Sequence, residues 1–469
     1  MDRIRHHLVL TAWCGTALFL GLWQTARAAE HYQLREDPKD ARVRKVAVEL
    51  KVNGKLFPSP GPEQALKLNV DAQFGYHERR LSATGRDAES LRCVRYYDEA
   101  KANINAGDQF SSSILRKSQR LIVSQGQVAG LEIFSPAGPL TYSELELLHV
   151  PTDSLAIQGL LTDSEIDLGE TWTAPVWSVP LVTGVEAVEK GKLTCKLEKI
   201  DDQVARIGFT GDVTGATVGA SSVVELRGHL LFDREQKLVT RIEATQTEKR
   251  AIGAVSPGLD VTAKVTVVRS LAEQGSRISD KELSGVPLEP NAASRLLLFE
   301  SPVWNVRLYH DRNWHVFHQA SDGALLRLLD QGGFISQCNI KKLPNAEPGQ
   351  HLSEKQFQQD IQQTLGKNFE QFLQAEKLNL KDGLFIYRVV AAGSIQRTNE
   401  KKEPEINAVQ WINYLVANPE GRQLTFVFSV DARQVKDFGT RDVSMVAGIE
   451  FLRPRNAPPP APAEKPKAK

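Results

Sequence analysis

Cysteine is scarce in this chain of 469 residues, which contains four. Cys14 lies in an apolar stretch near the N-terminus, which leaves Cys93, Cys195 and Cys338, an odd number with no C-x-x-C pair and no regular spacing. At most one disulfide can form among these three cysteines. Cys93 with Cys195 is one pairing that the sequence allows. Cys195 alternates with leucines two residues to either side, so we expect it to be a buried apolar residue. Disulfides therefore do not hold this fold together.

An excess of charge of one sign is also missing. The chain has 58 Lys and Arg against 57 Asp and Glu. Residues 1–28 are a predicted export signal. Without them, 55 Lys and Arg and 56 Asp and Glu remain, which gives a net charge of −1. A nucleic-acid groove would show a basic excess on one face, so we expect no nucleic-acid partner. After residue 28 no stretch approaches the ~20 apolar residues of a spanning helix, so we expect no transmembrane segment in the mature chain.

The local motifs of common catalytic sites are absent from the sequence. Gly219-Ala220-Ser221 lacks the following Gly of a G-x-S-x-G elbow, and His77-Glu78 lacks the second His of H-E-x-x-H. The residue after Gly191-Lys192 is not the Ser or Thr of a P-loop. A catalytic triad whose members are far apart in the sequence is still an alternative, because a single sequence cannot reveal one. We expect no cofactor and no catalytic residue.

The N-terminus has the three parts of a Sec-type export signal. Arg3 and Arg5 are followed by the apolar run Leu8–Trp23, and Ala26-Arg27-Ala28 fits the small-x-small pattern of signal peptidase. The alternative is an uncleaved anchor, for which the run is about four residues short of the ~20 that a spanning helix needs. A lipoprotein would need its Cys at the end of the apolar run. We expect cleavage near Ala28 and a soluble periplasmic or extracellular protein.

Residues 29–270 predict a β-rich domain. Apolar residues occupy every second position in Val46–Val52, Leu66–Tyr76 and Leu259–Val267, typical of antiparallel strands with one buried face. Several such strands predict a large curved antiparallel sheet or a partly open β-barrel. Asn53-Gly54 predicts a turn after the first strand, and one helix is expected at Ser143–Val150.

The remaining chain divides into a linker at 271–295, an α/β domain at 296–452 and a disordered tail of Pro, Ala and Lys at 453–469. In the α/β domain, Ser353 and Gln356 predict a helix start. An apolar stripe of this helix is expected to lie on a sheet and to run through Phe357, Ile361, Leu365, Phe369 and Phe372 or Leu373. A short helix is expected at Asp442–Ala447. Strands are predicted at Val303–Tyr309, Trp314–Gln319, Leu325–Leu329, Phe334–Ile340, Leu384–Ala391, Val409–Ala417 and Gln423–Val430, with a tight turn at Asn418–Gly421.

Three of the ten histidines lie within the nine residues 310–318. In a strand, His315 and His318 would point to opposite faces, so we expect no metal site there. Asp311–Asn313 predicts a turn between two strands, which would place His310 and His315 across a hairpin mouth. We take His310, Asp311, His315 and His318 as candidate binding residues.

The segment Leu161–Trp172 resembles a signature of exported bacterial β-rich proteins of unknown function, in which Leu-Pro is followed by Val and then by Gly-Asp/Glu-x-Trp. Thr162 departs from this signature, which has Pro at that position. The resemblance implies a β-rich exported domain. Gly169-Glu170 predicts a turn and Trp172 an anchor at one end of the sheet, with a binding role as the alternative.

Residues Val303–Phe451 resemble the photosystem II extrinsic P subunit and related bacterial lipoproteins in the order of strands, the long helix from Ser353, the hairpin around Trp411 and the terminal helix. The resemblance implies an α/β/α sandwich that binds or organises partners and carries no catalytic residues. Trp411 joins the candidate binding residues.

The sequence therefore predicts an exported, non-catalytic envelope protein that binds a partner protein, a polymer or an apolar ligand. One alternative is a hydrolase of envelope or extracellular polymers, with His315 or His318 as general base and Asp311 as its orienting carboxylate. The other is a lipid carrier, which would need a continuous cavity lined by residues such as Leu68, Val70 and Phe74.

Overall fold

The computed structural model describes residues 31–59, 64–81, 87–273, 277–398 and 404–453. The predicted export signal at 1–28 and nearly all of the predicted tail at 453–469 lie outside these ranges. Most of the described chain is antiparallel β-sheet, which confirms the β-rich class. No helix within these ranges is long and apolar enough to cross a membrane.

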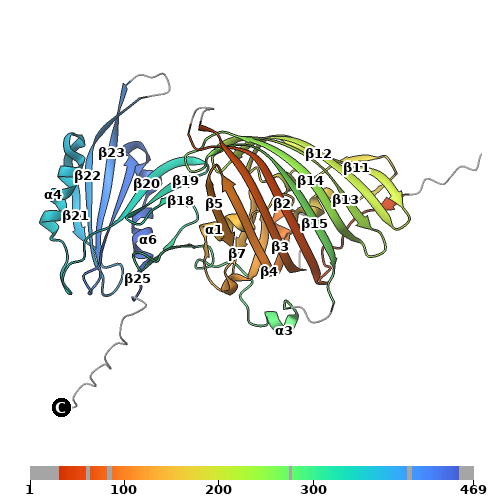
Figure 1. The fold of residues 1–469 in the computed structure, drawn as a ribbon, viewed down its shortest axis with the longest axis horizontal. Helices are drawn as coiled ribbons and strands as arrows, with labels where there is room; N and C mark the ends of the chain where they lie inside the picture. Colours follow the sequence, from red (N-terminus) through yellow and green to blue (C-terminus); the bar gives the residue numbers. More distant parts are fainter. Residues whose placement is uncertain (1–30, 60–63, 82–86, 274–276, 399–403, 454–469) are drawn as a thin grey trace, which may run out of the picture.

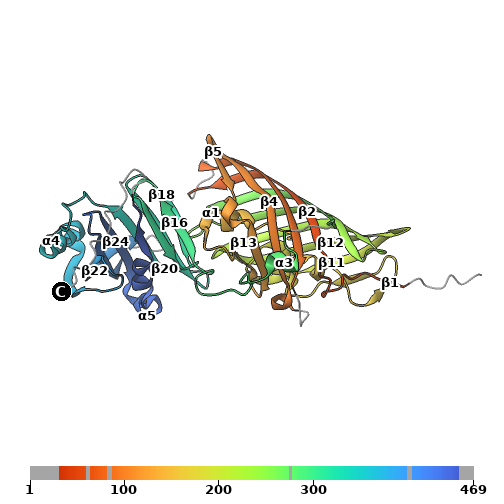
Figure 2. The same cartoon turned by 90° about the horizontal axis from the view of Figure 1, so that it is seen from below.

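The first half of the described chain forms one curved sheet of twelve antiparallel strands, whose curvature is seen in Figures 1 and 2. The strands in spatial order are β10 (Thr171–Thr173), β11 (Ala187–Asp201), β12 (Val204–Thr217), β13 (Ala220–Asp233), β14 (Leu238–Arg250), β15 (Gly258–Leu271), β2 (Arg44–Phe57), β3 (Leu66–Arg80), β4 (Arg92–Ala106), β6 (Leu121–Gln127) and β7 (Gly130–Phe134), with β5 (Gln109–Ile114) paired to one end of β4. A separate pair joins β1 (Tyr32–Gln33) to β9 (Glu165–Ile166).

The turn predicted at Asn53-Gly54 is wrong. β2 continues through both residues to Phe57 and pairs with β15 and β3 along its whole length. A Cβ at Gly54 would collide with the backbone of Asp260 and Val261 on β15. Glycine at this position therefore permits a close approach of two strands and marks no turn.

The inner face of the curved sheet is filled by the chain between β7 and β11. This segment contains α1 (Tyr142–Leu148), the 3-10 helix η4 (Ala156–Leu160) and α2 (Ser178–Thr183). α1 confirms the helix expected at Ser143–Val150, and Thr141 and Glu144 form its capping box. The core joins apolar side chains of the helical segment to alternate residues of the strands, among them Phe74, Leu148, Ile157, Val182, Cys195 and Phe232.

The second half contains a seven-stranded antiparallel sheet, seen on the left of Figure 1. Its order is β18 (Trp314–Gln319), β19 (Gly323–Asp330), β20 (Gly333–Lys342), β24 (Gln423–Asp431), β23 (Pro404–Ala417), β22 (Phe385–Thr398) and β21 (Phe369–Lys377). The helix α4 (Glu354–Leu365) packs on one face, and α5 (Val435–Phe438) and α6 (Arg441–Ala447) contribute to a core on the other. β18 matches its predicted bounds, and the expected terminal helix is α6.

The helix predicted to run from Ser353 through Phe369 and Phe372 is too long. Ser353 caps its start, since its side chain accepts a hydrogen bond from the backbone N–H of Gln356. The helix ends at Leu365, and Gly366, with a φ of +53°, turns the chain into β21. Phe369 and Phe372 still pack beside α4, but from a strand.

A four-stranded sheet connects the two halves. Its order is β25 (Ile449–Phe451), β17 (Val306–His310), β16 (Leu297–Ser301) and β8 (Leu140–Thr141), and β8 comes from the first half. The strand predicted from Val303 begins at Val306, because Ser301–Asn305 form turns. Two residues of the predicted linker at 271–295 contact the first half of the protein. Ile278 is buried among side chains of β4, β6 and β7, and Glu289 accepts from Arg92 on β4 at 2.7 Å.

Candidate functional site

The candidate histidines lie at the junction of the two halves. His310 ends β17 and is buried, with Nδ1 2.9 Å from the carbonyl oxygen of Asp311. Burial lowers the pKa of His310. The predicted hairpin is wrong, because β17 pairs with β16 and β25 whereas β18 pairs with β19 in another sheet. The turn after Asp311 is present, but it joins two sheets.

His315 contacts the first half of the protein. Its Nδ1 lies 3.3 Å from the hydroxyl of Tyr142 at the start of α1. Burial, with repulsion from His310, lowers the pKa of His315 to about 4, so the ring is neutral at pH 7. Its cross-strand partner Arg327 donates to the carbonyl of Ala254 in the β14–β15 loop. Protein contacts therefore occupy this face of β18.

The six candidate binding residues are not gathered at one point. His318 is exposed on β18, and Asp311 accepts from the backbone N–H of Asn313 at 2.8 Å. Trp172 packs against the core of the first half from β10, and Trp411 is buried on β23 in the second. No group of three or more His, Cys, Asp or Glu in the described ranges is placed to hold a metal ion. The three cysteines there are buried and free.

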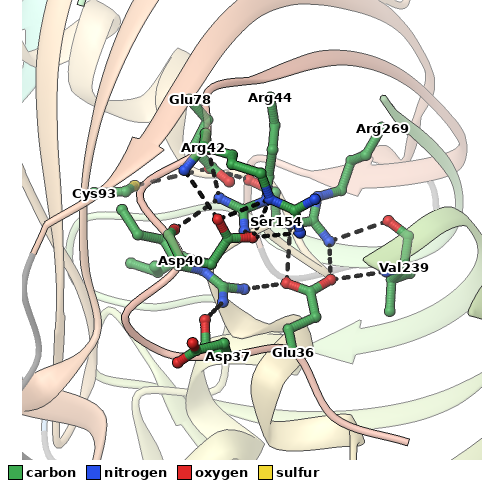
Figure 3. Close-up of polar contacts among 12 residues, drawn as sticks. Glu36, Asp37, Asp40, Arg42, Arg44, Glu78, Cys93, Ser154, Val239 and Arg269 are labelled. Carbon is green, nitrogen blue, oxygen red and sulfur yellow. Dashed lines mark hydrogen bonds and ion pairs between the residues drawn. The ribbon is translucent and has the colours of Figure 1, made fainter. Parts of the chain in front are cut away.

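A buried ion network on the inner face of the large sheet is the polar feature that sequence reasoning missed (Figure 3). Arg95 on β4 donates to Asp153 at 2.8 and 2.5 Å and to Glu78 on β3 at 3.0 Å. The network contains seven buried charged residues, which come from the strands and from the segments that cross them: Glu36, Arg44, Glu78, Arg80, Arg95, Asp153 and Arg269.

Glu36 is a second centre of this network. It comes from the segment before β2 and accepts from Arg269 on β15 at 2.7 and 3.3 Å, from Arg80, and from the backbone N–H of Val239 at 2.8 Å. Burial alone would raise the pKa of Glu36, but attraction by Arg269 and Arg80 outweighs burial and holds that pKa well below its usual range. Burial lowers the pKa of the nearby Arg44 to about 10, which still leaves it charged at pH 7.

The sequence did contain a signal for these residues. Arg44 stands two positions before Val46, and Arg269 two positions after Val267, so each is in phase with the buried face of its strand. Glu78 and Arg80 continue the inner phase of Tyr76 in the same way. These charged residues at strand ends are buried because each one finds an opposite charge: Arg80 and Arg269 pair with Glu36, Glu78 pairs with Arg95, and Arg44 pairs with Asp40.

The network fixes the helical segment to the sheet and leaves no space for a substrate. Ser154 donates to Glu78 at 2.5 Å and lies 2.9 Å from the hydroxyl of Tyr76, which superficially suggests an activated nucleophile. However, Ser154 is buried, and the cavity beside it measures about 10 Å³, enough for one water molecule. That cavity is also bounded by Phe74, so the acyl-chain space expected beside Phe74 is filled.

A larger cavity, of about 510 Å³, lies directly beyond the network. Its wall is formed by the segment before β2, by η4 and the residues after it, by the residues before α2, and by the turn between β13 and β14. The lining residues are Gln33, Arg35, Glu36, Asp37, Pro38, Lys39, Leu91, Gln158, Leu161, Thr162, Asp163, Pro175, Trp177 and Lys237. Glu36 thus belongs both to the network and to the cavity wall.

Some charged side chains of the cavity wall have ion-pair partners and others do not. Arg35 lies 3.6 Å from Asp163, and Asp37 accepts from the backbone N–H of Lys39 at 2.8 Å. Within the part of the chain that the structure describes, the ammonium groups of Lys39 and Lys237 form no ion pair. Both lysines are exposed, so the cavity opens to solvent beside two unpaired cations.

Comparison with known protein families and with curated proteins gives no match to this chain. Among solved structures, lipovitellin is 9% identical with a TM-score of 0.29 over 52% of this chain and 27% of that one. A Bacteroides thetaiotaomicron protein is 14% identical with a TM-score of 0.21 over 33% and 48%. DynF of the dynemicin biosynthesis pathway of Micromonospora chersina is 6% identical with a TM-score of 0.15 over 52% and 86%. At these scores the likenesses support no conclusion about function, and this chain spans less than half of the first two proteins.

Proposed function

We propose that this protein is an exported, non-catalytic binding protein of the cell envelope, and that its ligand occupies the cavity bounded by Glu36, Trp177 and Lys237. The observation that carries the proposal is a preformed cavity of about 510 Å³ on a wall fixed by buried ion pairs. Ligand sites commonly measure about 300–1,000 Å³ and are largely preformed. Because the strands and the helical segment are already fixed, binding requires little ordering of the protein.

The alternative functions have less support. A hydrolase using His315 would need an accessible base with a pKa near the working pH, but His315 is held against Tyr142 and its pKa of about 4 makes it a weak base at pH 7. A carrier that holds an acyl chain against Phe74 would need space that the helical segment fills. A polymer or a small molecule can reach the open cavity in the first half.

The proposal includes location and architecture. The export signal predicted at Arg3–Ala28 would deliver the mature chain to the periplasm or the cell exterior. For the half at 296–452 we propose an α/β/α sandwich that organises partners, because α4 and the pair α5 and α6 belong to cores on opposite faces of one sheet. The cationic tail would contact an anionic envelope polymer.

Native mass spectrometry of protein purified from its own envelope fraction tests the cavity. We expect a bound adduct on the wild-type protein and on Thr266→Trp, which adds a ring in a hollow on the outer face of the sheet. Thr162→Trp, which fills the proposed cavity, should lose the adduct. A wild-type protein without an adduct, or an adduct that survives Thr162→Trp, contradicts the proposal.

A further inference from the structure

The side chains of the cavity wall also indicate what kind of ligand it holds. We infer that the cavity binds an acidic sugar, a saccharide unit bearing a carboxylate or a phosphate. This inference rests on the proposed function and names its ligand class. Three features of the lining carry it: two exposed lysines without an ion pair, an aromatic side chain, and hydrogen-bond donors.

The cations favour an anionic ligand. Lys39 precedes β2 and Lys237 ends the turn between β13 and β14, so two distant segments each contribute an exposed lysine to the lining of one cavity. Two of the three carboxylates of the wall are paired with arginines, Glu36 with Arg80 and Arg269, and Asp163 with Arg35. The third, Asp37, accepts from the backbone N–H of Lys39 at 2.8 Å. An acidic group between the lysines would form charge-assisted hydrogen bonds, which are about twice as strong as neutral ones.

The turn that carries Lys237 is fixed in shape. Asp233 accepts from the backbone N–H groups of Glu235 and Gln236 at 3.0 and 2.8 Å, and Lys237 has a left-handed φ of +53°. A residue other than glycine is uncommon at such an angle. The turn therefore holds the Lys237 backbone in one orientation beside the cavity.

Part of the cavity lining is apolar and suits the C–H face of a sugar ring. Trp177 is half-buried and lines the cavity together with Leu161 and Pro175. An aromatic ring offers a rigid apolar surface at low entropic cost. Gln158 and Thr162 also line the cavity. The Thr162 hydroxyl accepts from the backbone N–H of Ser164 at 3.1 Å and the Gln158 amide oxygen accepts from Arg80, so each side chain keeps a donor for a ring hydroxyl. A purely apolar ligand would leave these two donors desolvated without an acceptor.

Binding of sodium D-glucuronate, D-glucose 6-phosphate and D-glucose, followed by isothermal titration, tests the inference. We expect one or both acidic sugars to bind and D-glucose to bind at least tenfold more weakly. Lys39→Gln and Lys237→Gln should each weaken acidic-sugar binding about tenfold. Lys264→Gln, a charge removal in the outer hollow, should leave it unchanged. Increasing salt should weaken binding, because both lysines of the lining are exposed to solvent.

The outcomes separate this inference from the proposed function. Equal binding of D-glucose and the acidic sugars overturns the inference, as does acidic-sugar binding that both lysine variants retain. If no acidic sugar binds while the native adduct is lost only in Thr162→Trp, the cavity function stands and the ligand class is wrong. Preference between glucuronate and glucose 6-phosphate decides whether the acid is a carboxylate or a phosphate. Trp177→Phe should reduce binding of every accepted sugar, since the ring contact is independent of charge.

Discussion

Glu36→Gln should strongly destabilise the large sheet while changing almost no volume. Glu36 is fully buried and its carboxylate compensates the guanidinium groups of Arg80 and Arg269. A glutamine keeps an oxygen for the backbone N–H of Val239, so the variant removes charge more than shape. Two buried cations are then left without their carboxylate.

The expected cost is about 3–5 kcal/mol at pH 7, the range for removing one partner of a buried ion pair. This is a large share of the ~5–15 kcal/mol by which folded domains are usually stable. The matched control is Glu235→Gln, at an exposed position in the β13–β14 turn, for which we expect a change within about 0.5 kcal/mol.

The cost should depend on pH in a defined direction. Because the pKa of Glu36 is held below its unfolded value of 4.5, its stabilising charge is fully present above pH 4.5. The contribution is lost as the pH falls below 4.5 toward the folded pKa. The difference between wild type and Glu36→Gln should therefore be constant from pH 7 to 5 and shrink in stronger acid.

Urea-dependent hydrogen exchange measured on peptides of β2, β3 and β15 gives the free energy of this sheet separately from the second half. A difference below about 1 kcal/mol, equal to that of Glu235→Gln, would refute the reasoning. If Glu36→Gln does not fold, Glu36→Gln combined with Arg269→Met provides the measurement. The double variant should recover part of the lost stability, since Arg269 is then no longer an unpaired cation, whereas Arg80 still lacks its carboxylate.

Three further predictions concern the second half and the junction. Asp442 is buried and accepts a hydrogen bond from Arg388 at 2.9 Å. Asp442→Asn should lower the free energy of unfolding, measured by urea denaturation, by about 2–3 kcal/mol. A decrease of less than about 0.5 kcal/mol would contradict a stabilising role of this contact. The folded pKa of His315, about 4, lies below its ordinary 6.5, so protonation favours unfolding. Between pH 7 and 4 the wild type should lose about 3 kcal/mol of stability that His315→Gln does not lose. An NMR titration of His315 near 6.5 would overturn this. Gly219→Ala adds a Cβ that meets the backbone of the β19–β20 turn, so it should lower the melting temperature more than Gly285→Ala, which has a similar φ and open space around it. Equal effects would show that the turn contact contributes nothing.

Local patterns identified most elements of this fold. Period-two alternation placed β3 and β15, and the Ser353 cap placed the start of α4, because both depend on neighbouring residues. Two errors arose where distant chain decides the outcome. β2 passes through Gly54 because a neighbouring strand lies close there, and β17 and β18 enter different sheets although only three residues separate them.

The candidate site depended even more on distant contacts. Arg269 and Glu36 are separated by 233 positions, and each alone is a charge at the end of a strand or loop. By itself, the sequence determined the β-rich class, the alternating faces and the absence of local catalytic motifs, because these follow from composition and near-neighbour spacing. Tertiary structure alone decided that seven charged side chains are buried together and that Lys39, Trp177 and Lys237 share one cavity, because only folding brings these distant segments of the chain together.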